Sequence, residues 1–190
     1  MRRPKRPTVD LLLLFVGVYL LQRLAGLVGV GPEAFALATP LARPWTLITT
    51  VYAHASLGHL LANAVALLVV GLVLEPFTTR RRFHGFVLGS GALAAVTEYL
   101  VGIALGSPVA VLGASGAVLA LYGYILAGNP LTGGLLARID LGRRARVALV
   151  VAVVLVVTVL TAGPGVAIVA HATGFGLGLV AGRLGVLRPK

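Results

Sequence analysis

One serine stands out in an otherwise apolar stretch of the chain. The stretch 111–120 reads VLGASGAVLA, and Ser115 has Gly113 two residues before it and Gly116 directly after it. A polar group inside an apolar membrane segment is energetically costly and marks a candidate functional site. At a helix start the same serine would meet free backbone N–H groups, which favour negative charge. Taken alone, the stretch favours a serine N-cap with packing glycines, and a nucleophile is the alternative.

Two other apolar segments also carry polar residues. In HASLGHLLAN, His59 and Asn63 are four residues apart and share one helix face. In HATGFGLG, His171 precedes Gly174 and Gly178, whose spacing of four lets another helix approach closely. Hydrogen bonding between helices explains the first segment about as well as chemistry does. A satisfied core histidine is the more usual explanation of the second.

The three segments together favour chemistry over separate packing roles. A serine and a histidine at the same depth, on helices that can touch, form a nucleophile and its base. His59, Asn63 and the Ser115 backbone N–H can supply hydrogen-bond donors to a tetrahedral oxyanion. The small residues expected to face the glycines after His171 are Gly116, Ala120 and Gly123. The combination predicts a buried serine hydrolase.

These side chains need a membrane scaffold to hold them. Of the 190 residues, 58% are hydrophobic and only 11% are charged, with a mean hydropathy of +1.02. So few charges cannot cover a soluble core of this size, so the chain is predicted to be an integral membrane protein in contact with the lipid bilayer. The formal charge of +11 comes from basic clusters between apolar runs, which favours membrane anchoring over nucleic-acid binding. The absence of cysteine excludes disulfides and thiolate chemistry, and no metal or organic cofactor is implied.

Apolar runs and helix breakers predict an all-α polytopic bundle that forms a single domain over residues 1–190. The six predicted spans are 9–29, 56–75, 83–105, 115–128, 146–162 and 165–183. The fourth span would be roughly 21 Å long at 1.5 Å per residue, whereas the hydrocarbon core is about 30 Å thick. Ser115 is therefore expected below one membrane surface, and His171 lies at a similar predicted depth in its own span.

The basic residues predict the orientation of the bundle. All Lys and Arg except Arg23 and Arg43 lie at the termini or in connections on one side. By the positive-inside rule, both termini are then cytoplasmic, and residues 1–8 form a basic cytoplasmic segment. The connection 30–55 lies on the outer side, and its prolines and aromatic residues suggest that it rests in the membrane interface.

The motifs resemble those of the rhomboid family of intramembrane serine proteases. GASG around Ser115 resembles the family GxSG motif, and HASLGHLLAN resembles the HxxxxHxxxN signature. AHATGFGLG resembles the AHxxGxxxG pattern, and PWTLITTVYAH resembles the segment before the second helix, with Trp45 in the tryptophan position. Together these matches run from residue 44 to residue 182 in the family's order and spacing. The resemblance implies a six-helix rhomboid-like bundle in the cell membrane.

The resemblance also implies roles for individual residues. Ser115 would be the nucleophile, and His171 its general base and acid. The implied oxyanion donors are His59, Asn63 and the amide of Ser115, and the site-supporting glycines are Gly113, Gly116, Gly174 and Gly178. The implied substrates are single-spanning transmembrane proteins.

Two positions depart from the family pattern. Thr46 stands where an arginine is common, which removes the usual salt bridges of the outer loop. Leu119 stands where an aromatic residue often supports the catalytic histidine, which predicts a less tightly oriented dyad. Glu98 is expected to make a structural hydrogen bond, His54 to be structural, and His84 to lie at the cytoplasmic interface.

Two other function classes remain as alternatives. The first is a catalytically inactive rhomboid-like protein that binds membrane helices, although such relatives typically lose the serine or the histidine. The second is a small transporter that uses the His and Asn cluster as a polar path. It predicts a broken helix in each half of an inverted repeat, and the sequence shows no such repeat.

Overall fold

The computed structural model describes residues 6–39, 42–127 and 167–189, together with residues 142, 144, 145, 148 and 152. Within this part of the chain the regular structure is helical, apart from one isolated bridge between Leu37 and Val111. The α-helices are α1 (Pro7–Leu27), α2 (Thr46–Tyr52), α3 (Leu57–Leu74), α4 (Arg80–Ala104), α5 (Ser115–Leu126) and α8 (Ile168–Leu184). Two short 3₁₀ turns are η1 (Pro32–Ala34) and η2 (Glu75–Phe77). The predicted all-α class is confirmed.

The helices differ in length and in their ability to cross a bilayer. α1, the continuous stretch of α3 and η2, and α4 are each long and apolar enough to span a membrane. α5 and α8 are apolar but shorter. A short helix surrounded by longer ones can begin inside the membrane only if other protein segments satisfy the backbone before it.

Local capping explains where several helices begin. α1 begins with Pro7, a residue that suits the first helical position because its missing N–H needs no partner there. α4 begins directly after Thr79, whose Oγ1 accepts a hydrogen bond of 3.3 Å from the backbone N–H of Arg82. The helix therefore starts three residues before the predicted start at residue 83, because the cap continues it through the arginines 80–82.

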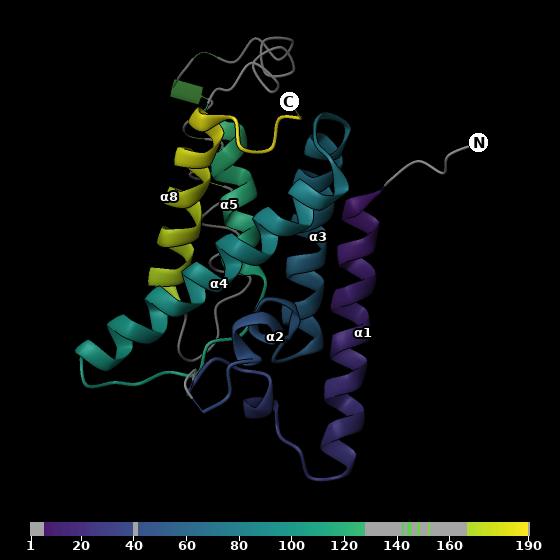
Figure 1. Ribbon diagram of the computed structural model, residues 1–190, viewed down its shortest axis with the longest axis vertical. Coiled ribbons are helices and arrows are strands. Elements are labelled where there is room, and N and C mark those ends of the chain that lie inside the picture. The colour runs from purple at the N-terminus through teal and green to yellow at the C-terminus, as the bar shows by residue number, and fades with distance from the viewer. Residues whose placement is uncertain are drawn as a thin grey trace.

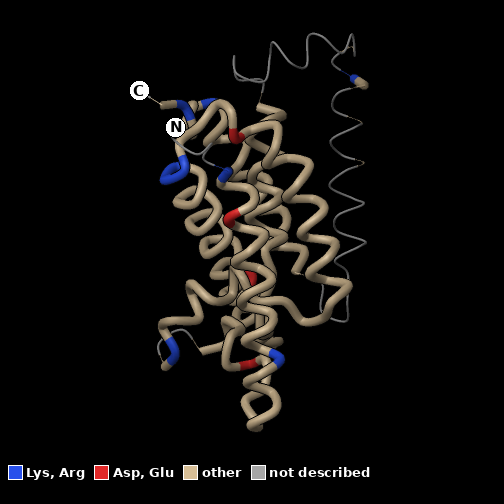
Figure 2. The backbone as a smooth tube through the Cα atoms, turned by 90° about the vertical axis from the view of Figure 1, so that its right-hand side faces the viewer, with Lys and Arg blue, Asp and Glu red and all other residues tan. Residues whose placement is uncertain are grey.

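The helices form a bundle with α4 crossing it obliquely. Figure 1 shows α1 beside α3, α8 beside α5, and α4 running across both pairs. α1 begins and α8 ends at the same end of the molecule, while α2 lies toward the opposite end (Figure 1). Lys and Arg gather mainly at the end that contains the start of α1 (Figure 2).

α5 lies at the centre of the packing. It contacts α3, α4 and α8, and every residue from Ser115 to Leu121 is buried. The hydroxyl of Tyr122 donates a 3.0 Å hydrogen bond to the Ala66 carbonyl, which ties α5 to α3. Residues that begin α5 are therefore held from several sides, as a precisely placed side chain requires.

The connection 30–55 is joined to the loop that precedes α5. Thr50 of α2 donates from its hydroxyl to the Val111 carbonyl at 2.6 Å, and its own carbonyl accepts from the Gly113 N–H at 2.9 Å. Leu37 exchanges two backbone hydrogen bonds with Val111. The connection predicted over 30–55 thus contains a short helix, α2, and this helix fixes the backbone just before Ser115.

Most of the fifth predicted span, 146–162, lies outside the described residues, as do the ends of the fourth and sixth spans at residue 128 and residues 165–166.

Candidate active site

Ser115 is the first residue of α5, but its hydroxyl does not cap that helix. The N-cap position belongs to Ala114, and no side chain caps the helix. The Ser115 Oγ lies 2.7 Å from Nε2 of His171 on α8, within hydrogen-bond distance. The two residues are only 7% and 5% exposed. The geometry therefore matches a hydroxyl directed at a base better than it matches an N-cap.

Glycines allow α5 and α8 to approach closely enough for this contact. A Cβ added at Gly174 would overlap the carbonyl of Gly116, and a Cβ added at Gly178 would overlap the carbonyl of Ala120. In the other direction, a Cβ at Gly123 would overlap the carbonyl of Phe175. The two backbones are thus in direct contact on both sides of the interface, and any larger residue would move His171 away from Ser115.

His59 lies against the loop that leads into Ser115. Gly113 has a φ of +130°, a conformation that side-chain-bearing residues rarely adopt. A Cβ at this glycine would lie 2.6 Å from Cε1 and 2.8 Å from Nε2 of His59. Gly113 is therefore needed twice, for its backbone conformation and for the space that the imidazole occupies.

Asn63 is fully buried one turn after His59. Its Nδ2 donates a 2.9 Å hydrogen bond to the His59 carbonyl, which leaves the second amide hydrogen for another acceptor. Among the described residues, its Oδ1 has no hydrogen-bond partner. A buried amide with spare hydrogen-bonding capacity is a group expected to meet a substrate or water.

His54 packs behind His59 and is almost completely buried. Its ring lies 5.0 Å from the Phe15 ring and 5.2 Å from the His59 ring, measured between centroids. Its backbone N–H donates to Oε1 of Gln22 at 3.0 Å. Burial, and secondarily the nearby His59, lower the pKa of His54 to about 3, so this imidazole stays neutral at physiological pH. The arrangement supports the structural role expected for His54.

Glu98 contacts the start of α8, one residue before His171. Its Oε2 accepts a 2.8 Å hydrogen bond from the Ala170 N–H. The N-cap residue of α8, Ala167, offers no side-chain cap, so a carboxylate from α4 satisfies a free N–H of the first turn. A negative charge at a helix N-terminus is also stabilising. Beside it, Thr97 Oγ1 lies 3.0 Å from Thr173 Oγ1.

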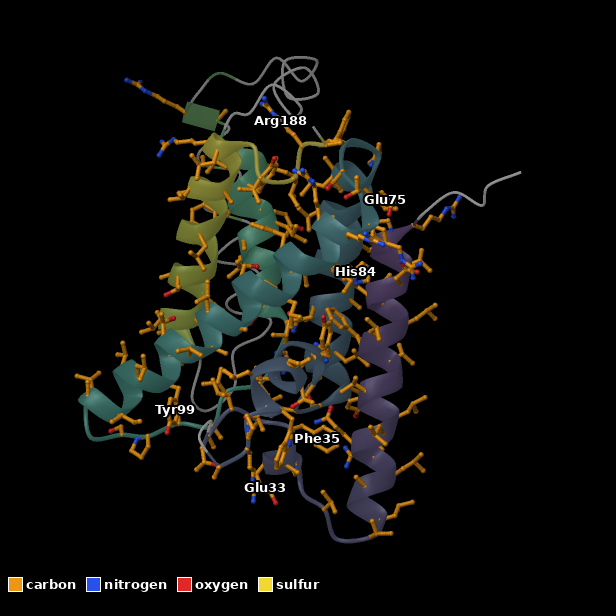
Figure 3. The ribbon with its side chains drawn as sticks, in the orientation of Figure 1. Glu33, Phe35, Glu75, His84, Tyr99 and Arg188 are labelled. Carbon is orange, nitrogen blue, oxygen red and sulfur yellow. The ribbon has the colours of Figure 1, made fainter. Side chains whose placement is uncertain are left out.

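A separate polar cluster lies between α1 and α4, near the end where α1 begins. Asp10 Oδ2 is 2.7 Å from Nε of Arg80 and 3.4 Å from Nε2 of His84. Figure 3 shows His84 on α4 directed toward α1. Across ranges 6–39, 42–127 and 167–189, no three His, Asp or Glu side chains converge as metal ligands.

The family model described as the Rhomboid domain matches residues 41–188, which is most of the chain. The chain belongs to the rhomboid family. It is accordingly a multi-pass membrane protein in contact with the lipid bilayer, as its apolar helices also indicate. No curated protein matches the chain.

The connection 30–55 of this rhomboid is held without ion pairs among its described residues. Thr46 is fully buried, and its hydroxyl donates to the Arg43 carbonyl at 2.6 Å. The Trp45 indole donates to the Ala34 carbonyl at 3.2 Å, and the Thr49 hydroxyl donates to the Phe35 carbonyl at 2.9 Å. Hydrogen bonds to backbone carbonyls therefore brace the segment in which Thr46 replaces the common arginine.

Proposed function

We propose that this rhomboid is an intramembrane serine endopeptidase that uses Ser115 and His171 as a catalytic dyad. The observation that carries the proposal is the 2.7 Å contact between Ser115 Oγ and His171 Nε2 inside a buried helix interface. Rhomboid family members are usually serine intramembrane proteases, which supports the same reading.

The proposed chemistry follows from the roles of the two side chains. Nε2 of His171 accepts the proton of the Ser115 hydroxyl as Oγ attacks the scissile carbonyl carbon. The imidazolium then gives this proton to the leaving amine as the C–N bond breaks, which leaves an acyl-enzyme. Water, deprotonated by His171, attacks the ester, and the proton returns to Ser115 Oγ when the carboxylic acid product leaves.

The oxyanion of each tetrahedral intermediate needs preorganised donors. The proposed donors are the backbone N–H of Ser115, at the start of α5, the imidazole of His59 and the spare amide hydrogen of Asn63. Loss of one such donor typically costs about 2.7–4 kcal/mol of transition-state stabilisation. Gly113, Gly116, Gly174 and Gly178 support the site by allowing the close approach described above.

The remaining parts of the proposal concern substrate and location. We infer a single membrane domain over residues 1–190, in the cell membrane, with both termini cytoplasmic. The substrates would be single-spanning proteins whose helix unwinds near its outer end, because a helical peptide bond cannot present its carbonyl to Ser115. Water would reach the site from the outer side.

The alternative is an inactive rhomboid-like protein that binds membrane helices. A missing or separated serine and histidine would favour this alternative. Here both residues are present and lie within hydrogen-bond distance of each other. The endopeptidase is therefore the better-supported function.

A cleavage assay tests the proposal directly. The parent, Ser115→Ala and His171→Ala are reconstituted in liposomes with a generic single-spanning substrate. Ser90→Ala serves as the matched control, because Ser90 is another buried serine, and its hydroxyl donates to carbonyls of its own helix. Cleavage by the parent and Ser90→Ala alone supports the dyad, and fluorophosphonate labelling should then be lost in Ser115→Ala and strongly reduced in His171→Ala, because His171 activates the serine. Equal cleavage by all four proteins would exclude Ser115 as the nucleophile.

The orientation can be tested because the chain contains no cysteine. Single cysteines placed at exposed Ala42 and at Pro189 report opposite sides of the membrane. A membrane-impermeant maleimide should label Ala42→Cys in intact cells and Pro189→Cys only after lysis. The reverse pattern would contradict cytoplasmic termini.

A further inference from the structure

A groove lies between α4 and α8 that plays no part in the proposed chemistry. Its volume is about 490 Å³. The apolar residues that line it include Gly85, Gly89 and Leu93 of α4 and Leu177, Val180 and Leu184 of α8. Leu93, Val180 and Leu184 are 54%, 56% and 74% exposed, so the groove opens outward to the surroundings of the bundle. In a membrane protein, those surroundings are lipid acyl chains.

The floor of the groove is open because of two glycines. A Cβ added at Gly85 or Gly89 would meet nothing within 4 Å. These residues are one helical turn apart, so together they form a shallow channel along α4. The space above these two glycines is not filled by atoms of the described part of the chain, so another molecule can occupy it.

Arg82 lines the groove at the end where α4 begins and α8 ends, and Arg188 follows α8 at the same end of the molecule. Nη1 of Arg82 donates to the carbonyls of Val186, at 3.0 Å, and of Arg188. In the described part of the chain, the only ion pairs involve Asp10, so neither Arg82 nor Arg188 has a carboxylate partner there. Nε of Arg188 is buried and has no hydrogen-bond partner among those residues. Figure 3 shows Arg188 at this end of the molecule.

We propose that this groove binds one anionic phospholipid from the leaflet that contains the start of α1 and the end of α8. One acyl chain lies along Gly85 and Gly89, and the phosphate oxygens accept hydrogen bonds from the guanidinium of Arg82, which lines the groove. Basic pockets between transmembrane helices on the cytoplasmic side are suited to anionic headgroups. Hydrogen bonds between guanidinium groups and phosphate are among the stronger ones in proteins.

Charge favours this occupant over a packed helix or a neutral lipid. A purely apolar helix seated on Gly85 and Gly89 would cover Arg82 without supplying a counter-charge, and burying an unpaired cation is costly. A zwitterionic lipid brings its own cation close to its phosphate, so it neutralises the guanidinium of Arg82 less well. An anionic phospholipid supplies both the apolar chain and a negative charge for Arg82, which has no carboxylate partner in the described part of the chain.

Native mass spectrometry of the full chain tests the proposal. The protein is exchanged into detergent micelles that contain phosphatidylglycerol and phosphatidylcholine in equal amounts, and retained lipid is counted. The parent is expected to retain one phosphatidylglycerol at least fivefold in excess over phosphatidylcholine. Arg82→Gln should abolish this preference. Arg81→Gln, an exposed arginine beside it that does not line the groove, should leave the preference unchanged.

A second variant keeps the test decisive if Arg82→Gln does not fold. Gly89→Leu places a side chain in open space and fills the groove, so it should fold and lose the retained lipid. Equal retention of both lipids by the parent overturns the proposal, as does unchanged phosphatidylglycerol retention in Gly89→Leu. A parent dimer that dissociates in Gly89→Leu, with no lipid retained, would instead assign the groove to a second copy of the chain. None of these outcomes depends on whether Ser115 is catalytic.

Discussion

Two faces of this bundle carry glycines at a spacing of four, and they differ in what fills them. On α8, a Cβ at Gly174 or Gly178 would overlap the backbone of α5. On α4, a Cβ at Gly85 or Gly89 would meet nothing within 4 Å. The same spacing therefore brings two helices into backbone contact at one place and leaves a channel at another. A glycine pattern predicts that a close approach is possible, but it does not predict what approaches.

The difference has a direct consequence for the proposed chemistry. The filled face holds His171 at 2.7 Å from Ser115, so changes on it are expected to act on cleavage. The open face lies in the α4–α8 groove, so changes there should leave cleavage intact. Substitutions on the two faces therefore test whether the filled face positions the dyad and the open face does not.

The largest effect is expected from Gly178→Ala, which breaks the filled face. The added methyl must push α8 away from Ala120, and overpacking typically costs about 1–3 kcal/mol. Because a misplacement of about 1 Å can cost roughly 100-fold in rate, we expect cleavage to fall by about that factor. Gly176→Ala, on the same helix but with nothing within 4 Å, is the matched control. Equal rates for the two variants in liposomes would show that close packing does not position the dyad.

The next effect is expected from Gly113→Ala, which tests the loop before α5. The substitution places a side chain at a φ of +130° and within 2.6 Å of the His59 ring. Such backbone strain costs about 1–3 kcal/mol, and displacement of His59 adds to it, so we expect cleavage to fall at least about tenfold. Gly106→Ala separates the two causes, because Gly106 also has a positive φ (+68°) but lies in open space. A similar loss in both variants would remove His59 from the explanation.

A smaller effect is expected from Glu98→Gln, which keeps an acceptor near α8 but removes its charge. A charge at a helix N-terminus contributes about 0.3–1 kcal/mol, up to about 2 when partly buried. We therefore expect kcat to fall by about threefold to tenfold with KM unchanged, because the change acts through the orientation of His171. Glu75→Gln is the control, since Glu75 accepts a 3.3 Å hydrogen bond from the Thr8 N–H between other helices. A change in KM alone would argue against a positioning role for Glu98.

The smallest effect, of opposite sign, is expected from Gly85→Ala on the open face. Alanine replaces glycine inside a helix without a clash, which stabilises by roughly 0.5–1 kcal/mol. Thermal unfolding in detergent should show a slightly higher midpoint, and cleavage should equal that of the parent. Destabilisation would mean that the open face is occupied, either by protein or by a bound lipid chain that the added methyl displaces.

Much of the arrangement could be predicted because its signals are local. Apolar runs gave α1, α3 and α5 to within a few residues, and the motif spacing pointed to Ser115, His59 and His171 together. α2 could not be separated from its surroundings, because a seven-residue helix in a mixed apolar segment has no clear period. The start of α4 lies three residues before the predicted one, because Thr79 caps a helix whose first three residues are arginine.

The sequence by itself determined that the chain is a membrane protein, because the free energy of transfer to lipid depends on composition. It also determined which residues can do chemistry, because that depends on residue type. Tertiary structure alone decided which glycine face is filled and which is open. It also decided that Glu98 meets the Ala170 N–H and that Arg82 and Arg188 converge without a carboxylate in the described part of the chain. The physical reason is that Ser115 and His171 are separated by 56 residues, and only the packing of α5 on α8 sets the distance between them.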